Sequence, residues 1–306
     1  MCKQLIFKCL DMKKQSTLLC ILLAGWLCNT QAQETQATVK ALETYALKDT
    51  TQGWKLSGIS GVTFGQTSLH NWSAGGNNTV SANAFFNASA NYLKNNWFWD
   101  NNLLAEYGMI YSSAYDWQKA ADKLNFKSVA GLGISSKWSA SALFNFATQF
   151  TKGYKYPDID RYISTFMAPA YADAALGFTY KPVKNYTLFI SPVAERATFV
   201  LNDSLSSTGA FGVEPGKKIK WETGAYLTAT ANQALWDNVN IISTLNLFTP
   251  YNQNFGNVDV NWDILISFKL HKLLTANLNT TLRYYGSESY EIQFKEIFGL
   301  GVTYQF

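Results

Sequence analysis

The chain has 306 residues, of which 15% are charged and 15% are aromatic, and its formal net charge is +4. This length suits one large all-β domain or two ordinary domains. The mild charge, with no cluster of Lys and Arg, argues against nucleic acid as a partner. No apolar run of about 18 residues follows residue 32, so the sequence predicts no membrane-spanning helix there.

The N-terminus has the layout of a signal peptide, predicted over residues 1–32 with Met12 as an alternative start. Lys13 and Lys14 are followed by the apolar residues 18–27, and Thr30 and Ala32 place small side chains before a cleavage site. A membrane anchor is the alternative, but the apolar stretch is too short for one. Residues 33–53 are expected to form a short periplasmic segment ahead of the main domain.

Cysteine usage supports export and narrows the chemistry. All four cysteines precede residue 29, at Cys2, Cys9, Cys20 and Cys28. The mature chain would therefore contain none, which excludes disulfides, thiolate metal sites and a cysteine nucleophile.

From Trp54 to Phe306 the sequence alternates with a period of two, which is typical of strands and not of helices. In residues 77–93 the even positions are apolar and the odd positions are polar, with Phe85 as the exception. Twelve such segments are predicted, at about 54–67, 77–93, 97–112, 123–134, 138–150, 171–180, 186–200, 218–230, 238–248, 258–270, 274–285 and 292–306.

These predicted strands are longer than the five or six residues of an average globular strand and match the length of a tilted membrane strand. Short connections also alternate with mostly longer ones, as in outer-membrane barrels. The predicted fold class is therefore an all-β, transmembrane, antiparallel up-and-down β-barrel of about 12 strands over residues 54–306. A soluble sandwich is the alternative, which would favour shorter strands. The barrel predicts a location in the bacterial outer membrane, with both chain termini in the periplasm and lipid as a partner.

Strand parity directs many charged side chains into the predicted lumen and turns Glu296 outward. Mixed charges inside a barrel fit a water-filled pore, but they fit equally a lumen that plugs itself with crossed ion pairs. If the loop between the third and fourth strands is centred near residue 116, Glu106 and Lys127 are opposite neighbours. The predicted lumen charges are Lys55, Asp100, Glu106, Lys123, Lys127, Lys218, Lys220, Glu222, Asp259, Asp263, Lys269, Arg283 and Lys295.

The last strand ends in the sequence FGLGVTYQF, where Gly301, Tyr304 and Phe306 have the spacing of the C-terminal signal read by the outer-membrane assembly machinery. The barrel-assembly machinery and periplasmic chaperones are therefore expected partners. An ordinary last strand is the alternative interpretation.

His70 lies two residues after Ser68 in the first long loop, which raises the possibility of a hydrolase. A catalytic triad needs a third group to orient the histidine, and Asp116, Asp158, Asp160 and Asp203 are the carboxylates expected in the outer loops. Asp158 and Asp160 could also hold Ca²⁺, although their spacing alone is a weak indication. Asp49 and Asp203 begin short sequences that resemble an O-glycosylation site. No catalytic residue, metal site or cofactor is assigned from the sequence.

The stretch SLHNWSAGGNNTVSANAFFN resembles the N-terminal signature of a family of Bacteroidetes outer-membrane β-barrel proteins that is catalogued as a domain of unknown function. A second stretch, residues 201–226, resembles a later loop and strand of that family, and the resemblance extends over about 53–306. It implies a fold and a location but no activity. The sequence thus favours a narrow or loop-gated channel for small polar solutes, with a closed structural or surface-interaction barrel and a hydrolase using His70 as alternatives. The residues that carry the signature are Ser68, Asn71, Trp72, Gly75, Gly76 and Asn78.

Overall fold

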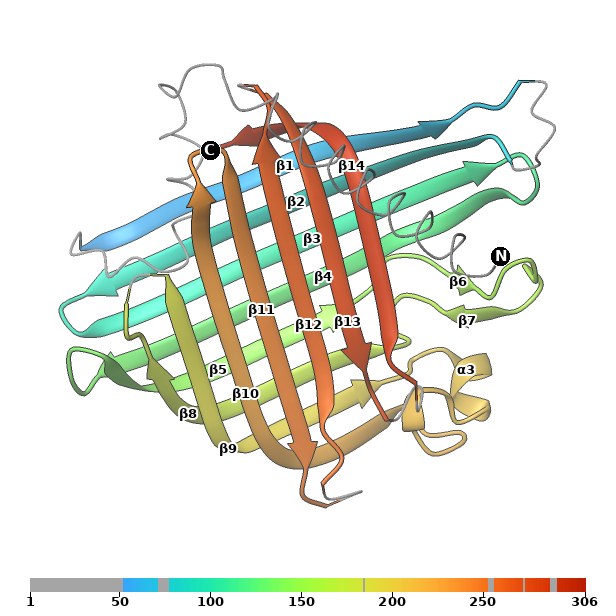
Figure 1. Ribbon diagram of the computed structural model, residues 1–306. Helices are drawn as coiled ribbons and strands as arrows, with labels where there is room; N and C mark the ends of the chain where they lie inside the picture. The colour runs from blue at the N-terminus through green and yellow to red at the C-terminus, as the bar shows by residue number, and fades with distance from the viewer. Residues whose placement is uncertain (1–51, 71–76, 184, 253–255, 272, 287–290) are drawn as a thin grey trace, which may run out of the picture. The chain divides into compact units, whose positions relative to one another are not determined.

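A computed structural model describes residues 52–70, 77–183, 185–252, 256–271, 273–286 and 291–306. Within these residues, twelve antiparallel strands form one closed barrel (Figure 1). Each strand is hydrogen-bonded to the preceding and following strand of the ring, which confirms the predicted up-and-down barrel. The ring consists of β1 (Gly53–Thr67), β2 (Thr79–Lys94), β3 (Trp97–Ser112), β4 (Asp116–Gly133), β5 (Trp138–Thr148), β8 (Ala170–Tyr180), β9 (Tyr186–Phe199), β10 (Ile219–Trp236), β11 (Val239–Pro250), β12 (Asp259–Lys269), β13 (Leu274–Tyr284) and β14 (Gln293–Gln305).

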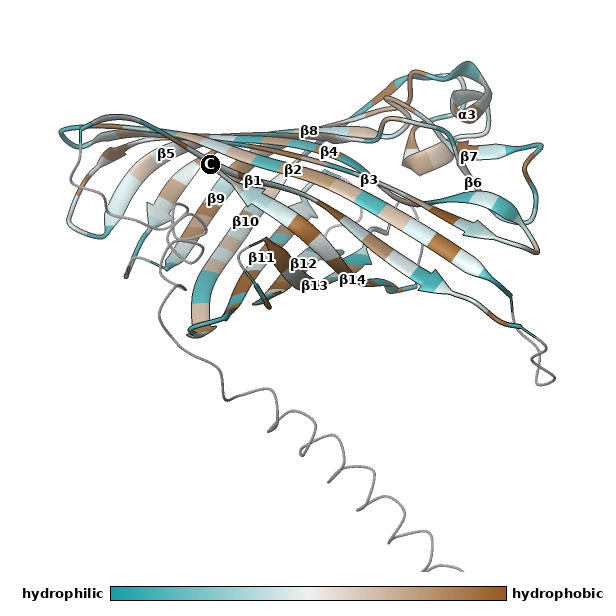
Figure 2. Cartoon of the chain, turned by 90° about the horizontal axis from the view of Figure 1, so that it is seen from above, coloured by the Kyte–Doolittle hydropathy of each residue, from teal (hydrophilic) through white to brown (hydrophobic). Residues whose placement is uncertain are grey.

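Hydrophilic and hydrophobic residues alternate along the strands (Figure 2), and the exposure of their side chains separates an apolar outer face from a mostly polar inner face. On β1, the side chains of Leu56 and Phe64 are 77% and 63% exposed, whereas those of Ser57 and Thr63 are buried. The same contrast holds on β2, where Phe86 is exposed and Ser89 is buried. A strand places successive side chains on opposite faces, so this pattern follows directly from the sequence period.

The connections at one end of the barrel are short and those at the other end are mostly long. The long-loop end contains the hairpin β6 (Gly153–Tyr154) and β7 (Tyr162–Ser164), inserted between β5 and β8. It also contains the helix α3 (Asp203–Ser207) and the short helix η2 (Ala210–Gly212), between β9 and β10. No helix in the described part of the chain is long and apolar enough to cross a membrane.

Two predicted boundaries are wrong. Strand β4 begins at Asp116, seven residues before the expected start, and a three-residue connection replaces the expected long loop after β3. Strand β10 continues to Trp236, beyond its expected end near residue 230. In both cases a bulge lets the ladder continue across an irregular stretch, one opposite Gly108 and one before Trp236.

The shorter β3–β4 connection also changes the register. Glu106 lies opposite Lys123, and Lys127 lies opposite Asn102. The expectation that Glu106 and Lys127 are opposite neighbours is therefore wrong, because the hairpin turns at residues 113–115 and not near residue 116.

The two halves of the ring run in different directions. In Figure 1, strands β10–β14 pass in front of β1–β5 and cross them steeply. Strand tilt of this kind is required to close a sheet into a barrel. Inside the ring, an apolar group from the five consecutive strands β5, β8, β9, β10 and β11 is buried. Its buried members are Leu143, Ala175, Phe189, Ala194, Tyr226 and Phe248.

Candidate functional site

The charged residues inside the barrel form the candidate site, because they are the polar groups that any solute in the lumen would meet. Glu106 is 6% exposed and accepts a hydrogen bond from Asn83 at 3.0 Å. Asp100 pairs with Lys181, in the β8–β9 turn, at 3.1 Å. Most of the remaining predicted charges are half-buried or buried on inward faces, namely Lys55, Lys220, Glu222, Asp259, Lys269, Arg283 and Lys295. The exception is Lys218, which is exposed in the loop before β10.

One ion pair joins opposite walls of the barrel. The Lys123 Nζ on β4 lies 3.1 Å from the Asp263 Oδ2 on β12. Five strands separate β4 from β12 in either direction around the ring, so the two residues come from directly opposite walls. Asp263 is held in place by hydrogen bonds from Thr281 and Asn261, at 2.8 and 2.7 Å.

A second side chain of β4 also crosses the lumen. The Lys127 Nζ donates to the Thr228 Oγ1 of β10 at 3.1 Å. Lys123 and Lys127 lie on the same face of one strand, four residues apart, because strand side chains repeat every two residues. Strand β4 therefore sends two cations across the interior at neighbouring levels.

A third crossing is centred on Arg196, on β9. Its Nε donates to Asp173 of β8 at 2.6 Å and its Nη1 donates to Asp259 of β12 at 3.0 Å. The guanidinium group also lies over the ring of Phe248, 4.1 Å from its centroid. The side chains of Arg196 and Asp173 are only 5% and 4% exposed, so this network is packed away from water. Arg283 adds a cation over the ring of Tyr285 at 4.2 Å.

The predicted lumen charges include neither Arg196 nor Asp173, and only for Arg196 does strand parity point the wrong way. On β9 the outward positions are even before residue 191, whereas Val193 and Glu195 are exposed after it. An irregularity at residues 191–193, seen in the pairing with both neighbours, reverses the parity. Pro192 is a recognisable signal for such an irregularity. Asp173 needed no such correction, because it has the same parity as the inward Tyr171.

Lys220 and Glu222 form an ion pair within β10, with their charged atoms 2.8 Å apart. In the loop before β10, Lys218 pairs instead with Asp203 at 2.8 Å. The hydrogen bond from this ammonium group holds the pKa of Asp203 below its usual value.

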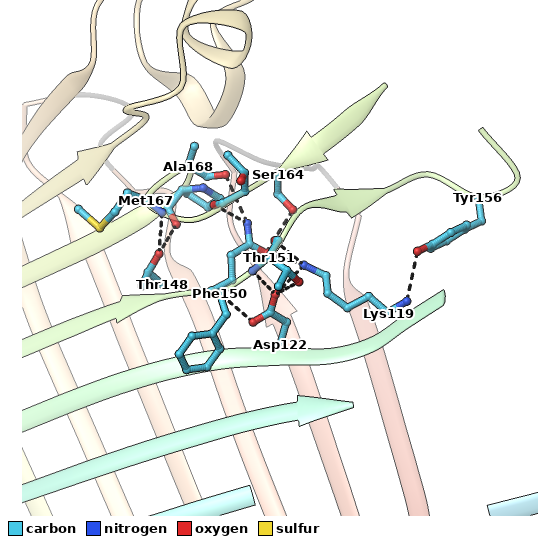
Figure 3. Close-up of polar contacts among 12 residues, drawn as sticks. Lys119, Asp122, Thr148, Phe150, Thr151, Tyr156, Ser164, Met167 and Ala168 are labelled. Atoms are coloured by element: carbon cyan, nitrogen blue, oxygen red, sulfur yellow. Dashed lines mark hydrogen bonds and ion pairs between the residues drawn. The ribbon is translucent and has the colours of Figure 1, made fainter. Parts of the chain in front are cut away.

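The long β5–β8 connection is folded back onto the barrel rim by a compact polar cluster (Figure 3). Asp122 accepts hydrogen bonds from the backbone amides of Phe150 and Thr151, at 2.7 and 2.9 Å, and pairs with Lys119 at 2.8 Å. Nearby, the Gln149 side-chain amide donates to the backbone carbonyls of Thr165 and Ala168. These contacts give the loop a defined conformation at the mouth of the barrel.

The β9–β10 connection packs against the β5–β8 connection. Ala168, Val200, Leu205 and Val213 form a buried apolar group shared by the two loops. Asn202 caps α3 by accepting from the Leu205 amide at 3.1 Å, and the Tyr162 hydroxyl of β7 donates to the same side-chain oxygen at 3.3 Å.

The family signature lies in the β1–β2 connection, and Asn71, Trp72, Gly75 and Gly76 are outside the described residues. Ser68 is exposed, and the Asn78 side chain accepts from the Leu69 amide at 2.6 Å. His70 is exposed and has no hydrogen bond or ion pair with another residue of the described part. The structure therefore provides no partner for the hydrolase alternative in the residues it describes.

Of the candidate calcium and glycosylation residues, the structure describes Asp158, Asp160 and Asp203. The Asp158 carboxylate accepts from the Asp160 amide at 3.0 Å, which is a local turn contact. No group of three or more His, Cys, Asp or Glu that could hold a metal ion occurs among the described residues. Asp49 lies outside them.

The C-terminal residues close the ring. The amide and carbonyl of Phe306 bond to Gly58 of β1 at 3.0 and 2.9 Å. A Cβ on Gly58 would lie 2.3 Å from the Phe306 ring, and one on Gly301 would lie 2.3 Å from the Val62 carbonyl oxygen. The close approach of these backbones explains both glycines. Tyr304 is 64% exposed on the outer face. Recognition of these residues by assembly machinery stays a prediction.

Comparisons with known proteins give a family match over part of the chain. A family model described as "Protein of unknown function (DUF3078)" matches residues 64–154, which include the signature loop but not the second stretch at 201–226. No curated protein matches the chain.

Solved structures with a similar course of chain include the translocator domain of the autotransporter NalP from Neisseria meningitidis, with 9% identity, a TM-score of 0.39 and coverage of 88% of this chain and 94% of that one. An outer membrane channel from Pseudomonas putida F1 has 11% identity, a TM-score of 0.40 and coverage of 84% and 96%. The Pseudomonas putida toluene transporter TodX has 10% identity, a TM-score of 0.30 and coverage of 87% and 83%. Because these scores are low, the fold assignment rests on the hydrogen-bond register of this chain.

The buried Arg196 network leads to a prediction about stability. Replacing Arg196 with Met leaves Asp173 and Asp259 without their cation, and removal of one member of a buried ion pair costs about 3–5 kcal/mol. We expect the free energy of unfolding, measured by urea titration of the folded barrel in lipid vesicles, to fall by about that amount. The double variant Arg196→Met/Asp173→Asn should lose less than the single variant.

A matched control is Lys217→Met, which breaks an exposed pair with Glu214 in the β9–β10 connection. Exposed pairs contribute little, so its unfolding midpoint should stay at the wild-type value. An Arg196→Met barrel that is as stable as this control would contradict the role assigned to the network.

Proposed function

We propose that the chain is an outer-membrane β-barrel that conducts small polar solutes through a narrow lumen, constricted by the Lys123–Asp263 pair. The observation that carries this proposal is the contact of these two side chains across opposite walls of the closed ring. The pair sets the width of the free passage at its level.

The outer surface supports a location in lipid. Large apolar side chains face outward all around the ring and are exposed. Examples are Leu56, Phe144, Leu176 and Phe298. Aromatic side chains gather beside the short turns, where the rings of Trp138 and Tyr180 pack in a tilted arrangement with centroids 4.5 Å apart. Apolar bands with aromatic girdles are typical of transmembrane barrels. A closed ring also satisfies the backbone in lipid, which an open sheet cannot do.

The interior supports a narrow passage that lies to one side. Lys123 and Asp263 are 30% and 27% exposed, so water reaches this pair. By contrast, the Arg196 network and the apolar group around Phe189 are almost fully buried. A solute would thus pass beside Lys123 and Asp263 and not through the packed half formed by β8–β11. Charges of both signs along such a route favour small polar solutes.

A closed structural barrel is the second candidate, and the packed interior of the β8–β11 half is the observation in its favour. In that case the ordered loops of the long-loop end, joined through Leu205 and Val213, would be the part of the molecule available to partners. A current measurement separates the two functions.

The test is a planar-bilayer recording from the refolded barrel. We expect small discrete current steps from the wild type. The double variant Lys123→Gln/Asp263→Asn removes the attraction between the two side chains across the lumen. Each current step should then be larger by about twofold or more, because the narrowest point of a pore limits its conductance. The matched control, Lys217→Gln/Glu214→Gln, removes an exposed pair outside the lumen and should leave the steps unchanged.

Silence from both the wild type and the double variant would contradict the channel and favour the closed barrel, provided that heat-modifiable gel mobility shows both to be folded. Larger steps in the control pair as well would show that the loops and not the constriction set the current.

The orientation is a separate proposal, namely that the long loops face outside the cell and both chain ends face the periplasm. Short turns remain in the periplasm when hairpins insert from that side. Single cysteines replacing the exposed Lys155 and Ser207 should react with a membrane-impermeant maleimide on intact cells. Cysteines replacing Lys94 and Ser136, at the short turns, should react only after the outer membrane is broken.

The unsubstituted chain is the control for background labelling, because its four cysteines all precede residue 29. The opposite labelling pattern would reverse the orientation.

A further inference from the structure

The seam between β1 and β14, where the ring closes, is shorter than any other in the barrel. The two strands share six register pairs, from Ile59↔Gln305 to Phe64↔Leu300, and Gly58 adds one further contact with Phe306. Every other pair of neighbours in the ring shares ten or more. The ring is therefore closed most weakly where its first and last strands meet.

Beyond this short seam the two strands diverge towards the long-loop end. Strand β1 continues to Thr67 beside β2, whereas β14 follows β13 from Gln293 to Gly299. Figure 1 shows β14 bending away from β1 along this stretch. The divergence leaves one side of each strand without its neighbour.

The ladder pattern identifies the backbone groups that lose their partners. Hydrogen-bonded pairs alternate along an antiparallel ladder, and Gly58 with Phe306 is one of them. Counting in steps of two, Gln66 and Phe298 would form the next bonded pair after Phe64 and Leu300. On β14 the amides and carbonyls of Phe298, Glu296 and Phe294 therefore point into the gap. The described residues provide no hydrogen-bond partner there.

The surroundings of these polar groups are apolar. Phe64, Phe294 and Phe298 are 63%, 65% and 64% exposed on the outer face beside the gap. On the inner face, the half-buried Ile297 adds an apolar side chain to this stretch of β14. Unpaired backbone groups are costly in such surroundings unless something binds them.

The charges on the free edge favour a small molecule over a protein strand. Glu296 is exposed on the outer face of β14, and the neighbouring Lys295 is half-buried on its inner face. Charged residues on a free edge oppose the addition of another strand. The free edge offers both amide donors and carbonyl acceptors, and the Glu296 carboxylate adds a further acceptor with a negative charge, so the edge as a whole favours a head group that donates hydrogen bonds. The exposed phenylalanines suit an apolar tail.

We propose that the diverging end of the β1–β14 seam is a lateral binding site for a single-tailed amphiphile that is taken from the bilayer and has a hydrogen-bond-donating, amine or hydroxyl head group. The head group binds the free edge of β14 beside Glu296, and the tail lies along Phe294 and Phe298. This goes beyond the channel proposal: it requires the barrel to be in a membrane but not to conduct.

Cysteine pairs test the geometry of the seam. A Val62→Cys/Val302→Cys pair lies in the bonded part and should form a disulfide on oxidation, since opposite strand residues have suitable spacing. A Gln66→Cys/Phe298→Cys pair would be opposite only if the seam continued, so it should stay reduced. Complete oxidation of both pairs would show a fully closed seam and overturn the proposal.

Spin-labelled amphiphiles test the site itself. The probes are tetradecylamine and tetradecanoic acid with the same nitroxide on the tail, added to vesicles that contain the barrel. Electron paramagnetic resonance measures the immobilised fraction of each. We expect the wild type to immobilise several-fold more amine than acid, and Glu296→Gln to remove most of this difference.

The matched control is Glu195→Gln. Glu195 is an exposed carboxylate on the outer face of β9, where both neighbouring strands are paired. The Glu195→Gln variant should leave the preference for the amine probe over the acid probe unchanged. Equal binding of the two probes by the wild type would overturn the proposal. So would an equal loss of the preference for the amine in Glu296→Gln and Glu195→Gln. Planar-bilayer recordings on the wild type report on the channel separately, so either proposal can fail alone.

Discussion

A sheet in lipid cannot leave its backbone amides and carbonyls unpaired, and this constraint organises the barrel. Eleven of the twelve seams satisfy it with ladders of ten or more residue pairs. The twelfth, between β1 and β14, satisfies it only from Gly58 to Phe64. The β1–β14 seam is therefore the weakest of the ring. The edge of β14 is free beyond it, because β14 bends away from β1 after their short shared ladder.

Closure of the ring also explains how the lumen is occupied. Twelve tilted strands bring opposite walls within reach of long side chains, so Lys123 and Lys127 extend from β4 to β12 and β10. Arg196 fills the half of the lumen near β8 and β9, where it pairs with the carboxylates of Asp173 and Asp259. A buried ion pair of this kind offers little net stability over apolar packing, although loss of one partner is costly. The charges therefore bear more on the proposed passage than on the energy of the fold.

The sequence predicts the barrel well because its signal is periodic. Alternation of side chains is enough to locate strands such as β3 and to turn Asp263 and Lys123 inward. It fails where the ladder is irregular: the bulge after Ser191 reverses the parity of Arg196, and the bulge beside Gly108 lets β4 begin early. Contacts across the lumen, such as Lys123 with Asp263, depend on the tilt of strands far apart in the chain, which local periodicity does not contain.

The account depends most on the contact between opposite walls. Cysteines replacing Lys123 and Asp263 can be treated with a bifunctional thiol reagent whose reach is about that of one extended lysine side chain. We expect an efficient intramolecular bridge in the folded barrel and none after unfolding, because β4 and β12 meet only across a constricted lumen. Separate modification of both cysteines without a bridge would mean that the lumen is wide at this level, and it would contradict the proposed constriction.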